Sequence, residues 1–96
     1  MAAVTRIGDA DVTHCSGMTR AEGSSNVFVN GIAVSRKGDN NTGHLLPGDP
    51  CPSHAAPITT GSTTVFINEK GCGRIGDAVS GCTSVAAGSS NVFAGG

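Results

Sequence analysis

Three side chains able to bind a metal stand at the same position in three similar stretches of the chain. Each stretch opens with arginine, one variable residue, glycine and aspartate, and the metal-capable residue follows the aspartate at the fifth position. These three side chains are His14, His44 and Cys82. Imidazole nitrogen and thiolate sulfur are ligands that Zn²⁺ takes in proteins. The repeated spacing therefore predicts three ligands of one metal site.

The fourth ligand is expected from an insertion. From the ligand position to the next Gly-Ser pair there are nine residues in the first stretch, seventeen in the second and six in the third. The extra length is the loop 45–57, which carries His54. Three equivalent ligands around a three-fold axis leave the last tetrahedral position on that axis, where only a residue outside the repeat can stand. We therefore predict one structural Zn²⁺, closed to solvent and bound by His14, His44, His54 and Cys82.

Other assignments of these residues stay open at this point. In the simplest alternative, His14 and His44 are surface loop residues and Cys82 is a small buried apolar residue. Cys15 or Cys51 could replace one of the four ligands, or the two could form a disulfide near the site. Iron is the alternative to zinc for such a ligand set.

Internal repeats organise the whole chain. A second signature starts at Gly23 (GSSNVFVNG), Gly61 (GSTTVFINE) and Gly88 (GSSNVFAGG). The copies span approximately 6–35, 36–73 and 74–96, and residues 1–5 complete the third copy. In this register Cys72 aligns with Val34 inside a strand, so we expect it to pack as a small apolar residue. We predict one all-β domain over 1–96, a closed pseudo-three-fold body of β repeats whose two ends lie close together.

The local patterns are those of short strands. β-branched runs at 27–29 and 32–34 flank Asn30-Gly31, the strongest short hairpin signal. The second copy offers the equivalent hairpin at 65–74, with Asn68-Glu69 as its turn. Each Gly-Asp pair is expected to form a tight turn, with a positive φ at glycine and the aspartate accepting hydrogen bonds from nearby backbone amides.

Composition limits the possible functions. The 96 residues include no Trp or Tyr, three Phe and 15 Gly, so the core is thin and a disulfide, metal or partner must help to hold it. A net charge of −1 gives no support for nucleic-acid binding. No apolar run approaches the ~20 residues that span a bilayer. Residues 1–12 lack the apolar core of a secretory signal, so we expect synthesis in the cytoplasm, where cysteines stay reduced.

These motifs resemble the PAAR-repeat family, the small tip proteins of contractile injection machines. The resemblance covers the Arg-x-Gly-Asp and Gly-Ser-x-x-Val-Phe signatures of all three copies and the order His, His, His, Cys. At the start of the chain, MAAVTRIGD keeps only the Ala pair, Arg6, Gly8 and Asp9 of the family's pattern.

The resemblance implies a β-structured cone with a zinc ion near its apex. Its base would sit on a trimeric β-helical spike, either a VgrG-type or a phage spike protein, and would sharpen that spike for transient membrane piercing. The chain would be a monomer by itself, without an effector extension, delivered outward as the tip of a type VI secretion system or phage tail. It could recruit separate effectors.

Two other functions are conceivable for such a chain. A small zinc hydrolase needs an open metal position and a general base. Asp49 is the only acidic residue of the long loop, and its Pro-Gly-Asp-Pro context favours a turn. A disulfide-stapled binding module conflicts with the unequal cysteine positions across the copies. We therefore expect a structural protein and no enzyme.

Overall fold

The structure is a computed structural model that describes residues 2–13, 17–45, 53–80 and 83–95. All of its regular elements are strands, which confirms the all-β prediction, and the described part contains no helix long and apolar enough to cross a membrane. The strands are β1 (Ala2–Ala3), β2 (Phe28–Val29), β3 (Ile32–Ala33), β4 (His44–Leu45), β5 (Ser53–His54), β6 (Phe66–Ile67), β7 (Lys70–Gly71), β8 (Ala78–Val79), β9 (Thr83–Ser84) and β10 (Phe93–Ala94).

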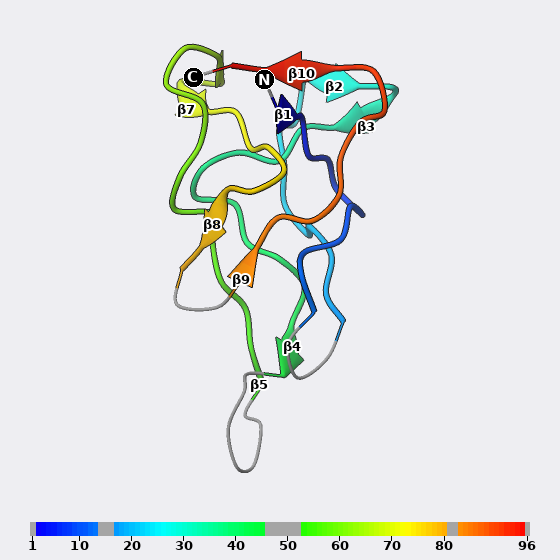
Figure 1. Ribbon diagram of the computed structural model, residues 1–96, viewed down its shortest axis with the longest axis vertical. Helices are drawn as coiled ribbons and strands as arrows, with labels where there is room; N and C mark the ends of the chain where they lie inside the picture. Colours follow the sequence, from blue (N-terminus) through cyan, green and yellow to red (C-terminus); the bar gives the residue numbers. More distant parts are fainter. Residues whose placement is uncertain (1, 14–16, 46–52, 81–82, 96) are drawn as a thin grey trace.

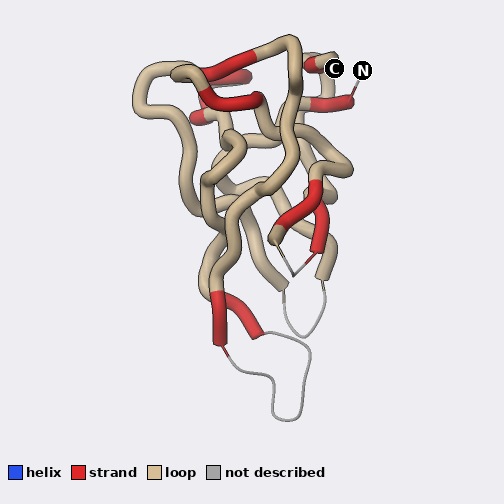
Figure 2. The backbone as a smooth tube through the Cα atoms, turned by 90° about the vertical axis from the view of Figure 1, so that its left-hand side faces the viewer, coloured by secondary structure: helices blue, strands red, loops and turns tan. Residues whose placement is uncertain are grey.

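The body is elongated, with extents of 39 × 23 × 22 Å, and it tapers. The broad end carries the antiparallel pairs β2–β3, β6–β7 and β1–β10 together with both chain ends (Figure 1). The pair β4–β5 lies at the opposite, narrow end, and β8–β9 lies between them (Figures 1 and 2). Long irregular segments run between the two ends, so short strand pairs alternate with a mostly irregular backbone (Figure 2).

Two of the broad-end hairpins have the predicted turns. Asn30 and Gly31 take φ values of 56° and 76°, and Asn68 and Glu69 take 54° and 70°. Positive φ at both central residues is typical of the type I′ turn, which matches the twist of a two-strand ribbon. Both hairpin predictions are confirmed, although each strand is only two residues long.

The Gly-Asp turns are confirmed as well. The amide of each motif aspartate donates to the carbonyl of the arginine three residues earlier, at 2.9, 2.9 and 3.1 Å. The glycine between them has φ near +91°, +93° and +92° at Gly8, Gly38 and Gly76. A side chain is strained in that conformation, so glycine is required at the third position of the turn.

Residues of one copy bridge to residues of the next. The isolated antiparallel bridges are Arg6 with Val34, Arg36 with Cys72, and Arg74 with Val4. Each motif arginine therefore pairs with the residue two positions before the arginine of the following stretch, and the last bridge runs back to the N-terminal segment. The ladder β1–β10 pairs Ala2 with Ala94 in the same way, so the two ends of the chain meet.

The core is divided between the two halves of the body. Beneath the broad end, the buried residues are Val4, Val34, Cys72 and Ala94. Cys72 is 1% exposed and has a free thiol, which confirms its predicted packing role. Burial raises the pKa of this thiol to about 11, because a thiolate there would lose its hydration. Nearer the middle, a second cluster contains Ala56, Ile58, Val79 and Val85.

A buried ion pair joins this second cluster. Arg20 Nη2 lies 2.7 Å from Asp11 Oδ2, and both side chains are fully buried. Asn41 Nδ2 donates to the same carboxylate oxygen at 3.0 Å. Arg20 Nε and Asp11 Oδ1 have no hydrogen-bond partner, so the pair is only partly satisfied. A pair of this kind contributes less to stability than its Coulomb attraction suggests.

Candidate metal centre and docking face

Two of the four predicted metal ligands lie opposite each other at the narrow end. In the β4–β5 ladder His44 is the direct cross-strand partner of His54. Directly opposed positions of an antiparallel pair have Cβ atoms about 4.5–5.5 Å apart. The structure therefore places these two positions next to each other, and their part in a metal site stays a prediction.

The segments that carry the other two ligands run beside each other. Val12, two residues before His14, donates its amide to the carbonyl of Ser84, two residues after Cys82, at 2.8 Å. Its carbonyl also accepts the Thr83 hydroxyl at 2.7 Å. These bonds hold the chain next to position 14 against the chain next to position 82.

A further pair of bonds ties the first stretch to the second. The amide of Thr42, two residues before His44, donates to the carbonyl of Thr19 at 2.8 Å. In return, the Thr19 amide donates to the Thr42 hydroxyl at 3.2 Å. The described neighbours of His14, His44 and Cys82 are thus joined laterally into one bundle of segments.

His14 and Cys82 themselves lie outside the described residues, as do Cys15, Cys51 and Asp49. Among the residues that the structure does describe, no three His, Cys, Asp or Glu side chains gather closely enough to hold a metal ion. The four-ligand set therefore remains a prediction, and so do the alternative roles of Cys15 and Cys51.

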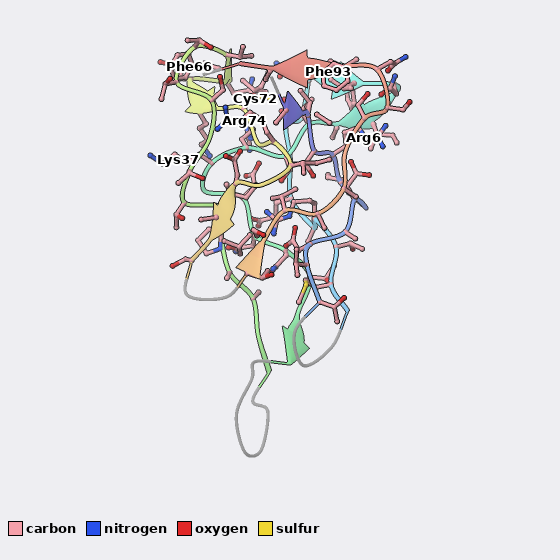
Figure 3. The ribbon with its side chains drawn as sticks, viewed as in Figure 1. Arg6, Lys37, Phe66, Cys72, Arg74 and Phe93 are labelled. Carbon is pink, nitrogen blue, oxygen red and sulfur yellow. The ribbon has the colours of Figure 1, made fainter. Side chains whose placement is uncertain are left out.

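The broad end presents three exposed aromatic side chains. Phe28, Phe66 and Phe93 are 57%, 59% and 50% exposed. Their sequence neighbours Val29, Ile67 and Val92 pack against the buried cluster below. Because side chains alternate between the two faces of a strand, inward packing of these neighbours turns each phenylalanine away from the core. Figure 3 shows Phe66 and Phe93 at this end, with Arg6 and Arg74 in the adjoining layer.

Beneath these aromatics, each Arg-x-Gly-Asp motif forms the same bidentate ion pair. In the first copy Asp9 Oδ2 accepts from the backbone amide and Nε of Arg6, both at 2.8 Å, and Oδ1 accepts from Nη2 at 3.1 Å. The pairs Arg36–Asp39 and Arg74–Asp77 repeat this pattern. The hydrogen bond to the aspartate raises the pKa of each guanidinium. The motif is thus a structural clamp with both charges neutralised.

The remaining nitrogen, Nη1, of each clamp arginine donates to an acceptor at the broad end. Nη1 of Arg6 donates to Asn30 Oδ1 at 3.1 Å. The equivalent bonds run from Arg36 to Asn68 Oδ1 and from Arg74 to the Gly95 carbonyl, each at 3.0 Å. The same three acceptors also receive the hydroxyls of Ser89, Ser24 and Ser62, respectively. The broad end is therefore tied together by a polar ring under its exposed aromatics.

The repeated serine has a local role too. Ser24 Oγ accepts the amides of Asn26 and Val27 at 3.2 and 2.9 Å. Ser62 and Ser89 make the equivalent bonds to the amides two and three residues later. This turn explains the Gly-Ser part of the signature, because it positions the chain just before each outward Phe.

The polar ring was not predicted from the sequence. In the sequence these arginines mark the repeat. Their constant distance from the aspartate is the signal that could have predicted the ion pair. The acceptors Asn30 and Asn68 share a register position, which was also visible. The third acceptor is the main-chain carbonyl of Gly95, for which no side-chain pattern exists.

Comparison with known protein families assigns the chain. The PAAR motif matches residues 47–96, which is more than half of the sequence. The chain belongs to the PAAR-motif family. No curated protein matches it. PAAR-motif proteins are structural rather than enzymatic, and the motif is associated with metal binding and with spike tips of contractile injection systems.

Proposed function

We propose that this PAAR-motif protein caps and sharpens the blunt end of a trimeric β-helical spike in a contractile injection machine. The observation that carries the proposal is the trio of exposed phenylalanines at the broad end, supported from below by three equivalent clamps. Three similar apolar positions on one chain suit a partner that presents three identical subunits. Exposed strand edges on that partner would also be covered by such a cap.

A zinc ion held by His14, His44, His54 and Cys82 would close the opposite end. Zinc in a closed tetrahedral site supplies folding energy and no reaction, with about 10–16 kcal/mol of apparent binding in small zinc peptides. The opposed positions of His44 and His54 and the lateral bonds around Val12 and Thr42 support this set. A thin, glycine-rich body needs stabilisation of this size at its narrow end.

Metal content separates the metal half of the proposal from its alternatives. We expect about one zinc per native chain. His14→Ala and Cys82→Ser should each lose the metal and unfold at lower urea concentration. Cys51→Ser is the matched control, since it changes a cysteine of the same region that the proposal leaves unligated. Zinc retained in both ligand variants, or lost in the control, would show that the ligand set is wrong.

Docking to the spike tests the other half. The variant Phe28→Ser/Phe66→Ser/Phe93→Ser should fold, because each of the three native side chains is at least half exposed to solvent. It should lose co-elution with the trimeric spike protein in size-exclusion chromatography. Val12→Ser, which removes an equally exposed apolar side chain from another part of the body, should bind normally. Undiminished spike binding by the triple variant would refute the docking face.

In this proposal the protein is made in the cytoplasm and leaves the cell as the tip of the apparatus. It crosses the target membrane only transiently and binds no nucleic acid.

A further inference from the structure

A cleft of about 670 Å³ opens on the side of the body beneath the β6–β7 hairpin. Its lining includes Lys37, Ile58, Thr59, Phe66, Glu69 and Lys70. Lys37 and Phe66 lie on the same side of the molecule, near β7 (Figure 3). The size is in the range of about 300–1,000 Å³ that is common for ligand sites.

The residues of this cleft differ from their counterparts in the other two copies. Lys37 follows the arginine of its clamp, and the same position holds Ile7 and Ile75 in the other copies. In the first copy Ile7 covers the glycine of the Gly-Ser pair, with its Cγ1 3.1 Å from where a Cβ on Gly23 would stand. A lysine at this position carries its charge outward and leaves apolar lining behind it.

The hairpin above the cleft also differs from its counterparts. The cross-strand partner of the phenylalanine is Ala33 in the first copy and Ala3 at the chain ends, but it is Gly71 here. A Cβ at Gly71 would stand 2.8 Å from the Ser62 carbonyl oxygen, so the hairpin and the segment below it approach more closely than a side chain permits. The residues around this cleft therefore differ from those at the same positions of the other two copies.

The cleft is lined by two lysines and one glutamate, and these side chains do not pair with one another in the described part of the chain. Neither Lys37 nor Lys70 forms an ion pair with a carboxylate in the part of the chain that the structure describes. Glu69 also lacks an ion pair there, and it occupies a turn position with φ of 70°, where the first copy has Gly31. Strained side chains persist at sites whose surroundings require them, often binding sites.

We propose that this cleft binds an acidic, extended segment of a partner protein, with one segment per tip. A carboxylate of the segment would meet the ammonium groups of Lys37 and Lys70, and an adjacent apolar side chain would pack on the exposed ring of Phe66. A trimeric spike presents three equal surfaces, whereas the residues that distinguish this cleft, Lys37 and Gly71, occur in one copy only. The proposal therefore goes beyond spike docking and does not depend on it.

The test selects binders from a random-peptide display library on the intact, zinc-loaded protein, followed by affinity measurements with the recovered peptides. We expect peptides that combine Asp or Glu with an apolar residue and compete with one another. Lys37→Ile should fold normally, because isoleucine is the residue of the other two copies at this position. Lys37→Ile/Lys70→Ile should weaken these peptides about tenfold or more, and added salt should weaken their binding to the native protein.

One control variant and three possible results decide the outcome. The triple phenylalanine variant removes one wall residue, so Phe28→Ser/Phe93→Ser is used to block spike docking while leaving the cleft intact, and it should keep peptide binding. Recovered peptides without acidic residues would overturn the proposal, and so would affinities unchanged in the double lysine variant. A library that yields no binder above background would overturn it as well. If Phe28→Ser/Phe93→Ser loses spike docking but still binds the peptides, peptide binding does not depend on spike docking.

Discussion

Removal of one clamp carboxylate should cost a large part of the stability of this small body. In Asp39→Ala, the amide and Nε of Arg36 each lose a hydrogen bond of 2.8 Å, and Nη2 loses one of 3.1 Å. The two side chains are only 5% and 14% exposed, so water replaces these bonds incompletely. The guanidinium keeps its hydrogen bond from Nη1 to Asn68 Oδ1.

The expected loss can be estimated from these contacts. Hydrogen bonds to charged groups contribute about 1.5–3 kcal/mol each, and they are not additive within one pair. Breaking a fully buried ion pair costs about 3–5 kcal/mol. Since Arg36 keeps some contact with solvent, we expect about 3 kcal/mol for Asp39→Ala. With an m-value of about 1 kcal/mol/M for a small domain, the urea midpoint should fall by about 3 M.

The assay is urea unfolding followed by circular dichroism, because the chain has no Trp or Tyr for intrinsic fluorescence. Zinc concentration is held constant, since bound metal shifts the apparent stability. Asp9→Ala removes the same set of bonds from a more exposed carboxylate, at 14%, and should cost about 2 kcal/mol. Ser25→Ala, at an exposed position, should change stability by less than about 0.5 kcal/mol. A loss for Asp39→Ala no larger than that of Ser25→Ala would refute the clamp argument.

Three further substitutions probe the backbone and the core. Glu69→Gly should raise the free energy of unfolding by about 0.5–1 kcal/mol, because glycine accepts the observed φ of 70° without strain; an unchanged urea midpoint would contradict this. Since burial raises the pKa of Cys72 from its ordinary value of 9.0 to about 11, the unfolded chain releases this proton first, and stability should fall as pH rises from about 9 to 11. That loss is on the order of 2 kcal/mol and should vanish in Cys72→Val, so equal pH profiles for the two proteins would be the negative result. Gly88→Ala should destabilise by about 2 kcal/mol in thermal unfolding, because its Cβ would stand 2.6 Å from the Val4 carbonyl oxygen; a wild-type Tm would show that the backbone yields easily.

Local chemistry made part of this fold predictable. Asn-Gly strongly favours the type I′ turn, so these two residues alone predict the position of the first hairpin. The Gly-Asp turns follow in the same way from the conformational freedom of glycine. Cys72 could be assigned to the core because its aligned counterpart is the apolar Val34. These predictions depend on neighbouring residues and on repeat register, which a sequence displays directly.

The remaining features depend on contacts between copies. Arg20 is fully buried and forms an ion pair with Asp11. No local rule predicts a buried charge, because burial of an arginine depends on a carboxylate that only tertiary packing supplies. The whole metal set stays a prediction: the structure pairs the backbone of His44 with that of His54, and His14 and Cys82 lie outside the described residues.

The ladder between β1 and β10 has a consequence for how the chain folds. Its partners Ala2 and Ala94 are separated by almost the whole sequence, so pairing them requires closure of a very long loop. The β2–β3 and β6–β7 hairpins, by contrast, close loops of two residues and can form early. During synthesis, at about 5–20 residues per second, β1 leaves the ribosome well before β10 and stays unpaired until β10 has been made. The proposed docking face is therefore complete only after β10, which carries Phe93, has emerged.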